Sequence, residues 1–157
     1  MLKKGLDLDD DLLSQLEVVV ASMHVAGSDE KNNTKRLIAA AENPNVHMLG
    51  HLSGRLLLER APQKLNQQAV IDACAETGTW IELNANPYRF DLDWRHWQYA
   101  KSRGVKCVIN CDAHRNDHAG FLRLGTAIAR KGWLTKADVM NTLPLAKLRK
   151  ELAKKRG

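Results

Sequence analysis

Short apolar runs rich in β-branched residues alternate with longer amphipathic segments along this chain. Buried strands are expected at 17–23, 46–49, 80–84 and 105–111. Apolar residues spaced three and four apart predict helices from a Thr34 cap to 43, then at about 66–78, 93–104 and 121–131. Shorter helices are expected from Asp9 or Asp10 to about 16, from 136, and after Pro144. A strand followed by a helix four times over predicts an α/β fold with parallel strands and right-handed crossovers, both faces of the sheet being covered.

Polar side chains follow the last apolar residue of each predicted strand. In chain order they are His24, His51, Asn84, Asn86, Asp112 and His114. The carboxyl ends of parallel strands meet at one edge of a sheet, where ligands and catalytic groups gather. Asp112 and His114 are two positions apart, so on an extended chain both side chains point the same way. Nitrogen and oxygen ligands that converge on one point suit a divalent metal ion of the Zn, Mn or Fe kind.

Composition limits the alternatives to that picture. With 157 residues, 44% hydrophobic and 27% charged, the chain fits one ordinary globular domain. No apolar run is long enough for a membrane span and no leader pattern is visible, so a cytoplasmic protein without a membrane partner is expected. Cys74, Cys107 and Cys111 are odd in number and lack metal-site spacing. They imply neither a disulfide framework nor a cysteine-based zinc site.

The net charge is +6 and the isoelectric point is near 9.4. Much of the excess lies in a basic helical tail at about 145–157, where lysine and arginine crowd between Lys147 and Arg156. A basic balance favours a polyanionic partner such as nucleic acid. A solvated helix face with a frayed terminus explains the same residues, and both interpretations stay open.

Several motifs occur in an order that resembles a known family. They are Val20-Ala21-Ser22-Met23-His24, Asn43-Pro44 through Gly50-His51, Ser53-Gly54-Arg55, Glu82 through Leu92, Cys111-Asp112-Ala113-His114 and Arg130-Lys131-Gly132-Trp133-Leu134. This series is similar to the C-terminal PHP (polymerase and histidinol phosphatase) domain of the bacterial DNA polymerase X family. The resemblance covers nearly the whole chain.

The resemblance implies a βα barrel with clustered metal ions at the C-terminal rim of the strands. It also implies a phosphoesterase that uses Mn²⁺ or Zn²⁺, with Mg²⁺ as an alternative, and that removes nucleotides from DNA 3′ ends. Carried over by position, the metal ligands are His24, His51, Asp112 and His114. The family's first histidine motifs would precede the equivalent of Gly5, so this chain is expected to be a partial, N-terminally truncated PHP barrel spanning 1–157.

Other polar residues near the same rim have a functional and a structural interpretation. Glu82, Asn84 and Asn86 could orient a ligand histidine, and Glu82 could equally be a base or a buried ion-pair partner. Arg55 and Arg89 suit bidentate phosphate binding. Structural pairing of these arginines with Glu59 or Asp91 is the alternative.

Three functions remain open from sequence. The first is a metal-dependent phosphoesterase that acts on DNA ends. Its expected partners are DNA and a separate N-terminal PHP or polymerase chain, which would complete the site. The second is a truncated or degenerate PHP module that binds metal or nucleic acid without hydrolysis. The third is a small-molecule phosphatase similar to histidinol phosphatase. A barrel that begins at 17–23 would also leave an open sheet edge, through which self-association is expected.

Overall fold

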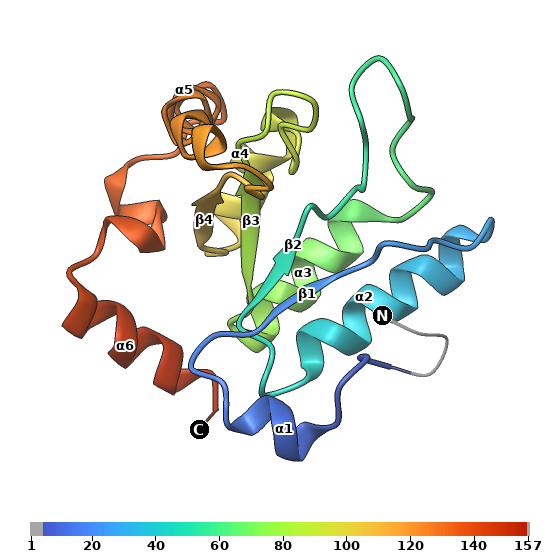
Figure 1. Cartoon of the computed structure of the whole chain (residues 1–157). Coiled ribbons are helices and arrows are strands. Elements are labelled where there is room, and N and C mark those ends of the chain that lie inside the picture. Colours follow the sequence, from blue (N-terminus) through green and yellow to red (C-terminus); the bar gives the residue numbers. More distant parts are fainter. Residues whose placement is uncertain (1–4, 157) are drawn as a thin grey trace.

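A parallel sheet of four neighbouring strands forms the centre of the computed structural model, which describes residues 5–156. The strands are β1 (Val20–Ser22), β2 (Met48–Gly50), β3 (Trp80–Asn84) and β4 (Cys107–Asn110), in that spatial order. The register places Val20 opposite Met48, and Met48 opposite Trp80. Helices connect the strands, so the predicted α/β class is confirmed, as is its parallel sheet (Figure 1). The arrangement agrees with part of a PHP-type βα barrel.

Six α-helices of the described part of the chain surround or flank this sheet. They are α1 (Asp10–Ser14), α2 (Glu30–Glu42), α3 (Gln67–Thr77), α4 (Trp94–Ser102), α5 (Leu122–Lys131) and α6 (Leu145–Lys154). Short 3-10 turns lie at η1 (Asn116–Phe121), η2 (Lys136–Asp138) and η3 (Met140–Thr142). Within residues 5–156, none of the helices has the length and apolar character needed to cross a membrane.

The element boundaries that differ most from the sequence expectation are those of α2 and β1. Helix α2 begins at Glu30, because the Asp29 carboxylate accepts from the backbone N–H groups of Lys31 and Asn32. The prediction that Thr34 caps this helix is therefore wrong. The Thr34 hydroxyl instead donates to the Glu30 carbonyl inside the helix. Strand β1 has three residues instead of the expected seven positions at 17–23.

The two faces of the sheet are covered by different parts of the chain. Because side chains alternate along a strand, Leu49 and Ile81 face one side while Met48 and Trp80 face the other. Helices α2, α3, α4 and α5 cover the first side and build the larger core. On the second side, Met48, Trp80 and Val108 form a smaller cluster with Met140 of η3 and Leu152 of α6.

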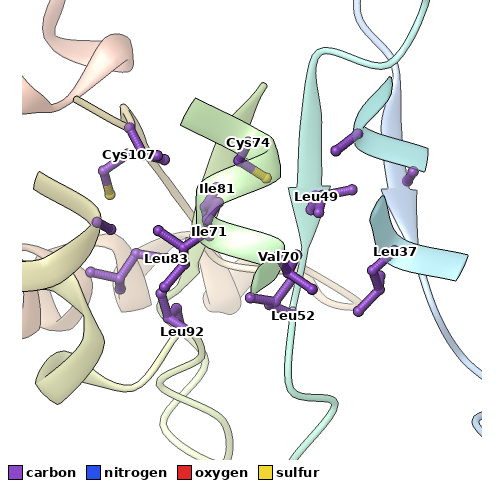
Figure 2. Packing of buried hydrophobic residues seen from close by; sticks show 14 of the residues in the cluster. Leu37, Leu49, Leu52, Val70, Ile71, Cys74, Ile81, Leu83, Leu92 and Cys107 are labelled. Carbon is purple, nitrogen blue, oxygen red and sulfur yellow. The ribbon is translucent and has the colours of Figure 1, made fainter. Parts of the chain in front are cut away.

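Figure 2 shows the larger core, with Val70, Ile71 and Cys74 of α3 lying among the strand residues Leu49, Ile81 and Leu83. Cys74 and Cys107 are fully buried free thiols, and burial raises the pKa of Cys74 to about 12. A buried neutral thiol behaves as a small apolar group. Cys74 and Cys107 therefore belong to the apolar core.

The last described residues of the basic tail bind backbone carbonyls of other helices. The Lys155 ammonium donates to the carbonyls of Ala41 and Thr77, at 2.8 and 2.9 Å, near the C-termini of α2 and α3. The Arg156 guanidinium donates to backbone carbonyls at the end of α1 and just after it. Cations at helix C-termini satisfy carbonyls that have no partner within the helix. Lys155 and Arg156 therefore join three helices, whereas a solvated, frayed terminus had been one expectation.

The outer side of β1 is partly open. Val18 and Val20 are 43% and 47% exposed beside a groove of about 320 Å³, which the segment from Leu6 to Leu16 also lines. Leu13 of α1 is buried, so this segment covers part of the first strand. Residues 1–4 and 157, the two ends of the expected span 1–157, lie outside the described residues.

Candidate metal and phosphate site

The side of the sheet that carries Met48 and Trp80 becomes polar toward the carboxyl ends of the strands. Gly50 lies there between Ser22 of β1 and Glu82 of β3. A Cβ atom at Gly50 would meet the Ser22 hydroxyl at 2.5 Å and the Glu82 carboxylate at 3.5 Å. The missing side chain leaves room for both polar groups directly beside His51.

His24 and His51 are brought together at this rim. Their ring centroids are 5.1 Å apart in an edge-to-face arrangement. His51 is buried, and its Nδ1 has no hydrogen-bond partner among the described residues. Burial, followed by the nearby positive charge of Arg89, lowers the pKa of His51. A neutral imidazole with a buried free nitrogen is the form of histidine that binds a metal ion.

Asp112 belongs to the same polar group. Its Oδ2 accepts from the Asn84 amide at 3.2 Å and lies 3.4 Å from Nε of Arg89. The Asn84 amide also donates to Oε2 of Glu82, the oxygen that accepts from the His51 backbone N–H, so this network connects Asp112 to His51. Of the four residues that the resemblance identifies as ligands, the structure thus pairs the rings of His24 and His51 and connects Asp112 to them through hydrogen bonds.

His114 does not join them. Its side chain is 75% exposed, and Nδ1 lies 2.7 Å from the Asp112 backbone carbonyl and 3.9 Å from the Asp112 carboxylate. Over residues 5–156, no set of three or more His, Cys, Asp or Glu side chains is arranged to hold a metal ion. The residues therefore fit one ion near the His24–His51 pair better than they fit a cluster of ions.

Backbone strain coincides with this rim. His51 and Asp112 adopt positive φ angles of 29° and 50°, which non-glycine residues rarely use. Leu58 and Phe90, in the neighbouring loops, do the same at 68° and 41°. Strained residues of this kind gather at functional sites, where the surrounding structure holds them in place.

Glu82 is the centre of a buried hydrogen-bond network. Its Oε2 accepts from the His51 backbone N–H at 2.6 Å and from Asn84, and its Oε1 accepts from Asn110 at 3.1 Å. Burial raises the pKa of Glu82, and these donors partly oppose that shift. Among the described residues Glu82 contacts no arginine or lysine side chain closely enough for an ion pair, so orientation of His51 is the role its contacts support.

The two candidate phosphate-binding arginines differ in their surroundings. Arg55 is buried, pairs with Asp93, and donates to the carbonyls of Arg89 and Phe90. All three of its nitrogen atoms are thus used within the protein, which favours a structural role. Arg89 is mostly buried but reaches Asp112 at the rim, so its guanidinium is the better placed of the two.

Asn86 stabilises the loop after β3. Its side-chain oxygen accepts from the Tyr88 N–H, and its own N–H donates to the Asn84 side chain.

Sequence reasoning did not identify Asn110 or Gly50 as site residues. Asn110 ends the same strand that leads to Asp112, so its strand-end position was the signal that could have found it.

Comparison with known proteins follows this geometry. The chain is 38% identical, over 141 residues, to the DNA polymerase/3′-5′ exonuclease PolX of Bacillus subtilis (strain 168), a match that includes 89% of the chain. The chain is a relative of the PHP domain of the bacterial DNA polymerase X family. The match spans 25% of the length of that polymerase. No protein-family profile matches the chain.

Relatives of this chain also include proteins named as probable phosphatases. One from Thermoanaerobacter sp. (strain X514) is 27% identical over 97% of the chain and 63% of its own length. Another, from Caldanaerobacter subterraneus subsp. tengcongensis, is 30% identical over 69% of the chain and 44% of its own length. The chain therefore spans less than two thirds of each of these relatives. Their names, like that of the polymerase, denote enzymes that act on phosphate esters.

Proposed function

We propose that this chain is a metal-dependent phosphoesterase module that acts on nucleic-acid ends. The observation that carries the proposal is the His24–His51 pair, in which the buried Nδ1 of His51 lacks a partner while Asp112 and Arg89 lie beside it. Two imidazoles and a carboxylate are ligands that Mn²⁺ and Zn²⁺ accept, and Mg²⁺ is an alternative. A guanidinium next to them suits a phosphate oxygen.

A divalent ion held by the His24–His51 pair, with the Asp112 carboxylate as a third ligand once its side chain turns toward the ion, would polarise a phosphoryl oxygen of the substrate. The chain's own residues support that arrangement. Glu82 fixes the backbone of His51, and the Asn84 amide donates to Asp112 and so orients its carboxylate. Arg89 would bind a non-bridging phosphate oxygen and add positive charge where negative charge develops.

Metal binding is the direct test. Titration calorimetry with Mn²⁺ and with Zn²⁺ would compare the wild-type chain with His24→Gln, His51→Gln and the control His96→Gln, which alters an imidazole of α4 outside the pair. We expect the two site variants to bind at least about tenfold more weakly, a loss typical of removed ligands and of their orienting partners. Binding by His51→Gln that equals the wild type would contradict the proposal. Thermal melts identify variants that are unfolded.

Hydrolysis distinguishes the candidate functions. A phosphodiester probe, bis(p-nitrophenyl) phosphate, and a monoester probe, p-nitrophenyl phosphate, would be offered with Mn²⁺, together with a 3′-labelled oligonucleotide. We expect slow hydrolysis by the chain alone, with the diester and the oligonucleotide preferred. Arg89→Gln should lower the rate further, because the phosphate loses a charged partner.

The relatives named as probable phosphatases support a second candidate, a phosphatase for small monoesters. Preference for the monoester probe would favour that function. Metal binding without hydrolysis of any probe would favour the non-catalytic module. A separate chain that supplies further PHP or polymerase residues is a proposed partner, and recovery of hydrolysis on mixing would support it.

A further inference from the structure

Two exposed side chains lie in neighbouring loops, one of which carries Arg89 of the candidate site. Leu58 lies in the loop that follows β2, and Tyr88 lies in the loop that follows β3. Leu58 is fully exposed and Tyr88 is 62% exposed. The loop that carries Leu58 extends well away from the sheet in Figure 1. We name Leu58 and Tyr88 together the apolar ridge.

The position of Leu58 has a conformational cost. Leu56 and Arg60 exchange backbone hydrogen bonds at 2.9 and 2.8 Å, which closes a three-residue turn with Leu58 at its middle. There the φ angle of Leu58 is 68°, a conformation that glycine adopts much more easily. A strained backbone and a fully solvated leucine both oppose stability, so folding does not explain this residue type. A contact between Leu58 and another molecule would explain it.

The two loops are fixed to each other. The Leu57 N–H donates to the Tyr88 carbonyl at 2.6 Å, and the buried Arg55 donates to the next two carbonyls, those of Arg89 and Phe90. These bonds fix the backbones of the two loops to each other before any ligand binds. Binding to a preformed surface costs less conformational entropy than binding to mobile loops.

The ridge adjoins the charge that a phosphate would need. Tyr88 directly precedes Arg89, whose Nε lies 3.4 Å from Asp112 in the candidate site. The chain as a whole carries a net charge of +6, which attracts polyanions. An exposed aromatic ring next to a site arginine is the combination by which proteins bind single-stranded nucleic acid, with bases on the ring and phosphate on the cation.

We infer that Leu58 and Tyr88 form a surface that binds unpaired bases of a single-stranded nucleic-acid end while Arg89 binds its phosphate. The inference rests on the proposed function and names its substrate class. Base stacking tolerates any sequence, so the surface selects a nucleic-acid strand over a small phosphate monoester without selecting a sequence.

The test measures binding without metal, so that it does not depend on hydrolysis. Fluorescence anisotropy in EDTA would follow a labelled oligothymidylate with wild type, Tyr88→Ala, Tyr88→Phe and Leu58→Ser. Trp133→Ala is the control, because Trp133 is also exposed but lies outside the two loops. Its carbonyl accepts from Lys101, which belongs to the last turn of α4. We expect Tyr88→Ala to weaken binding about fivefold or more, the effect of losing one stacked base. Tyr88→Phe and Trp133→Ala should bind within about twofold of wild type.

Two further measurements separate base contacts from charge. With an abasic strand of equal length, Tyr88→Ala and Leu58→Ser should bind like the wild type. Arg89→Gln should instead reduce the salt dependence of binding by about one counterion on either strand. The inference is overturned if the wild type does not bind the oligothymidylate or if the ridge variants bind it as the wild type does. It is also overturned if ridge variants alter only self-association, which would indicate a protein contact.

If the chain binds the strand through the ridge but His51→Gln leaves metal binding unchanged, the proposed hydrolase fails and the nucleic-acid surface stands. If metal binding depends on His51 while the ridge variants have no effect, the hydrolase stands and its substrate class is different. The two proposals can therefore fail separately.

Discussion

The backbone N–H of Val19 donates to Nδ1 of His47 at 3.1 Å, so an imidazole joins the residues just before β1 and β2. Nδ1 can accept this bond only while it carries no proton. Burial lowers the pKa of His47 in the folded protein, and the nearby charge of Arg156 acts in the same direction. A histidine whose pKa is lowered by folding stabilises the fold above about pH 6.5 and withdraws that stability as the pH falls.

We therefore expect the free energy of unfolding to depend on His47 between about pH 7.5 and about pH 5.5. His47→Asn offers an amide oxygen to Val19 and does not titrate. Urea unfolding should show that the wild type loses more stability than the variant over this interval, by about 1 kcal/mol, the worth of one hydrogen bond. Equal losses of stability in the two proteins would show that protonation of His47 does not contribute to the pH dependence of folding. The comparison cancels contributions from His51 and His96, which both forms retain.

Arg55 and Arg95 both pair with Asp93, but in different surroundings, and this difference makes a matched test. The Arg55 side chain is 10% exposed and that of Arg95 is 68% exposed. Arg55→Ala should destabilise the protein by about 2–5 kcal/mol, because the carbonyls of Arg89 and Phe90 lose their buried donor while Asp93 keeps only its exposed partner Arg95. Arg95→Ala should cost much less, because water solvates this exposed guanidinium and takes over its contacts. Chemical unfolding of both variants is the measurement, and similar values would mean that Arg55 is not the link between the loops.

Lys155 allows a second matched comparison. Its ammonium contacts two helix carbonyls, while the neighbouring Lys154 is 69% exposed and pairs only with Glu151. Lys155→Met should lower the free energy of unfolding by about 1–3 kcal/mol, because two carbonyls lose a charged donor. Lys154→Met should change it by less than about 0.5 kcal/mol. A Lys155→Met protein that melts like the wild type would mean that solvent replaces the ammonium without cost.

The outer side of β1 leads to a prediction about association. Val18 and Val20 present apolar surface beside a groove at the first strand of the sheet. Exposed strands with apolar side chains promote pairing with other chains. We propose that the chain self-associates there, and we expect Val18→Thr with Val20→Thr to reduce light scattering at high protein concentration. Leu145→Ser, at an exposed leucine of α6, is the control. A monodisperse monomeric wild type would contradict this prediction.

The rim could be located from sequence because its pattern is local. Each strand is an apolar run that ends in a polar residue, so His51 and Asp112 were assigned to one edge without knowledge of any contact. The position of His114 could not be obtained in this way. The positive φ of Asp112 ends the extended geometry on which the two-residue spacing argument depends, and the His114 side chain turns outward.

Partners far apart in sequence were harder to predict. The carboxylate that pairs with Arg55 belongs to Asp93, 38 positions away, whereas Glu59 and Asp91 had been considered. Asp91 instead accepts from the N–H groups of Ser53 and Gly54. The prediction of where α2 starts failed for a different reason. Asp29 and Thr34 are both good N-cap residues, and only packing decides between them.

The contacts of Arg156 have a consequence for the order of events during synthesis. Its guanidinium bonds to the carbonyl of Leu13, 143 positions earlier, and to that of Ser14. While a ribosome is still making the chain, helix α1 has no access to this partner until residue 156 has left the exit tunnel. The four strands and the helices between them are complete well before that moment. The nascent chain can therefore form its sheet first, and α1 gains its final attachment only after translation has passed the last helix.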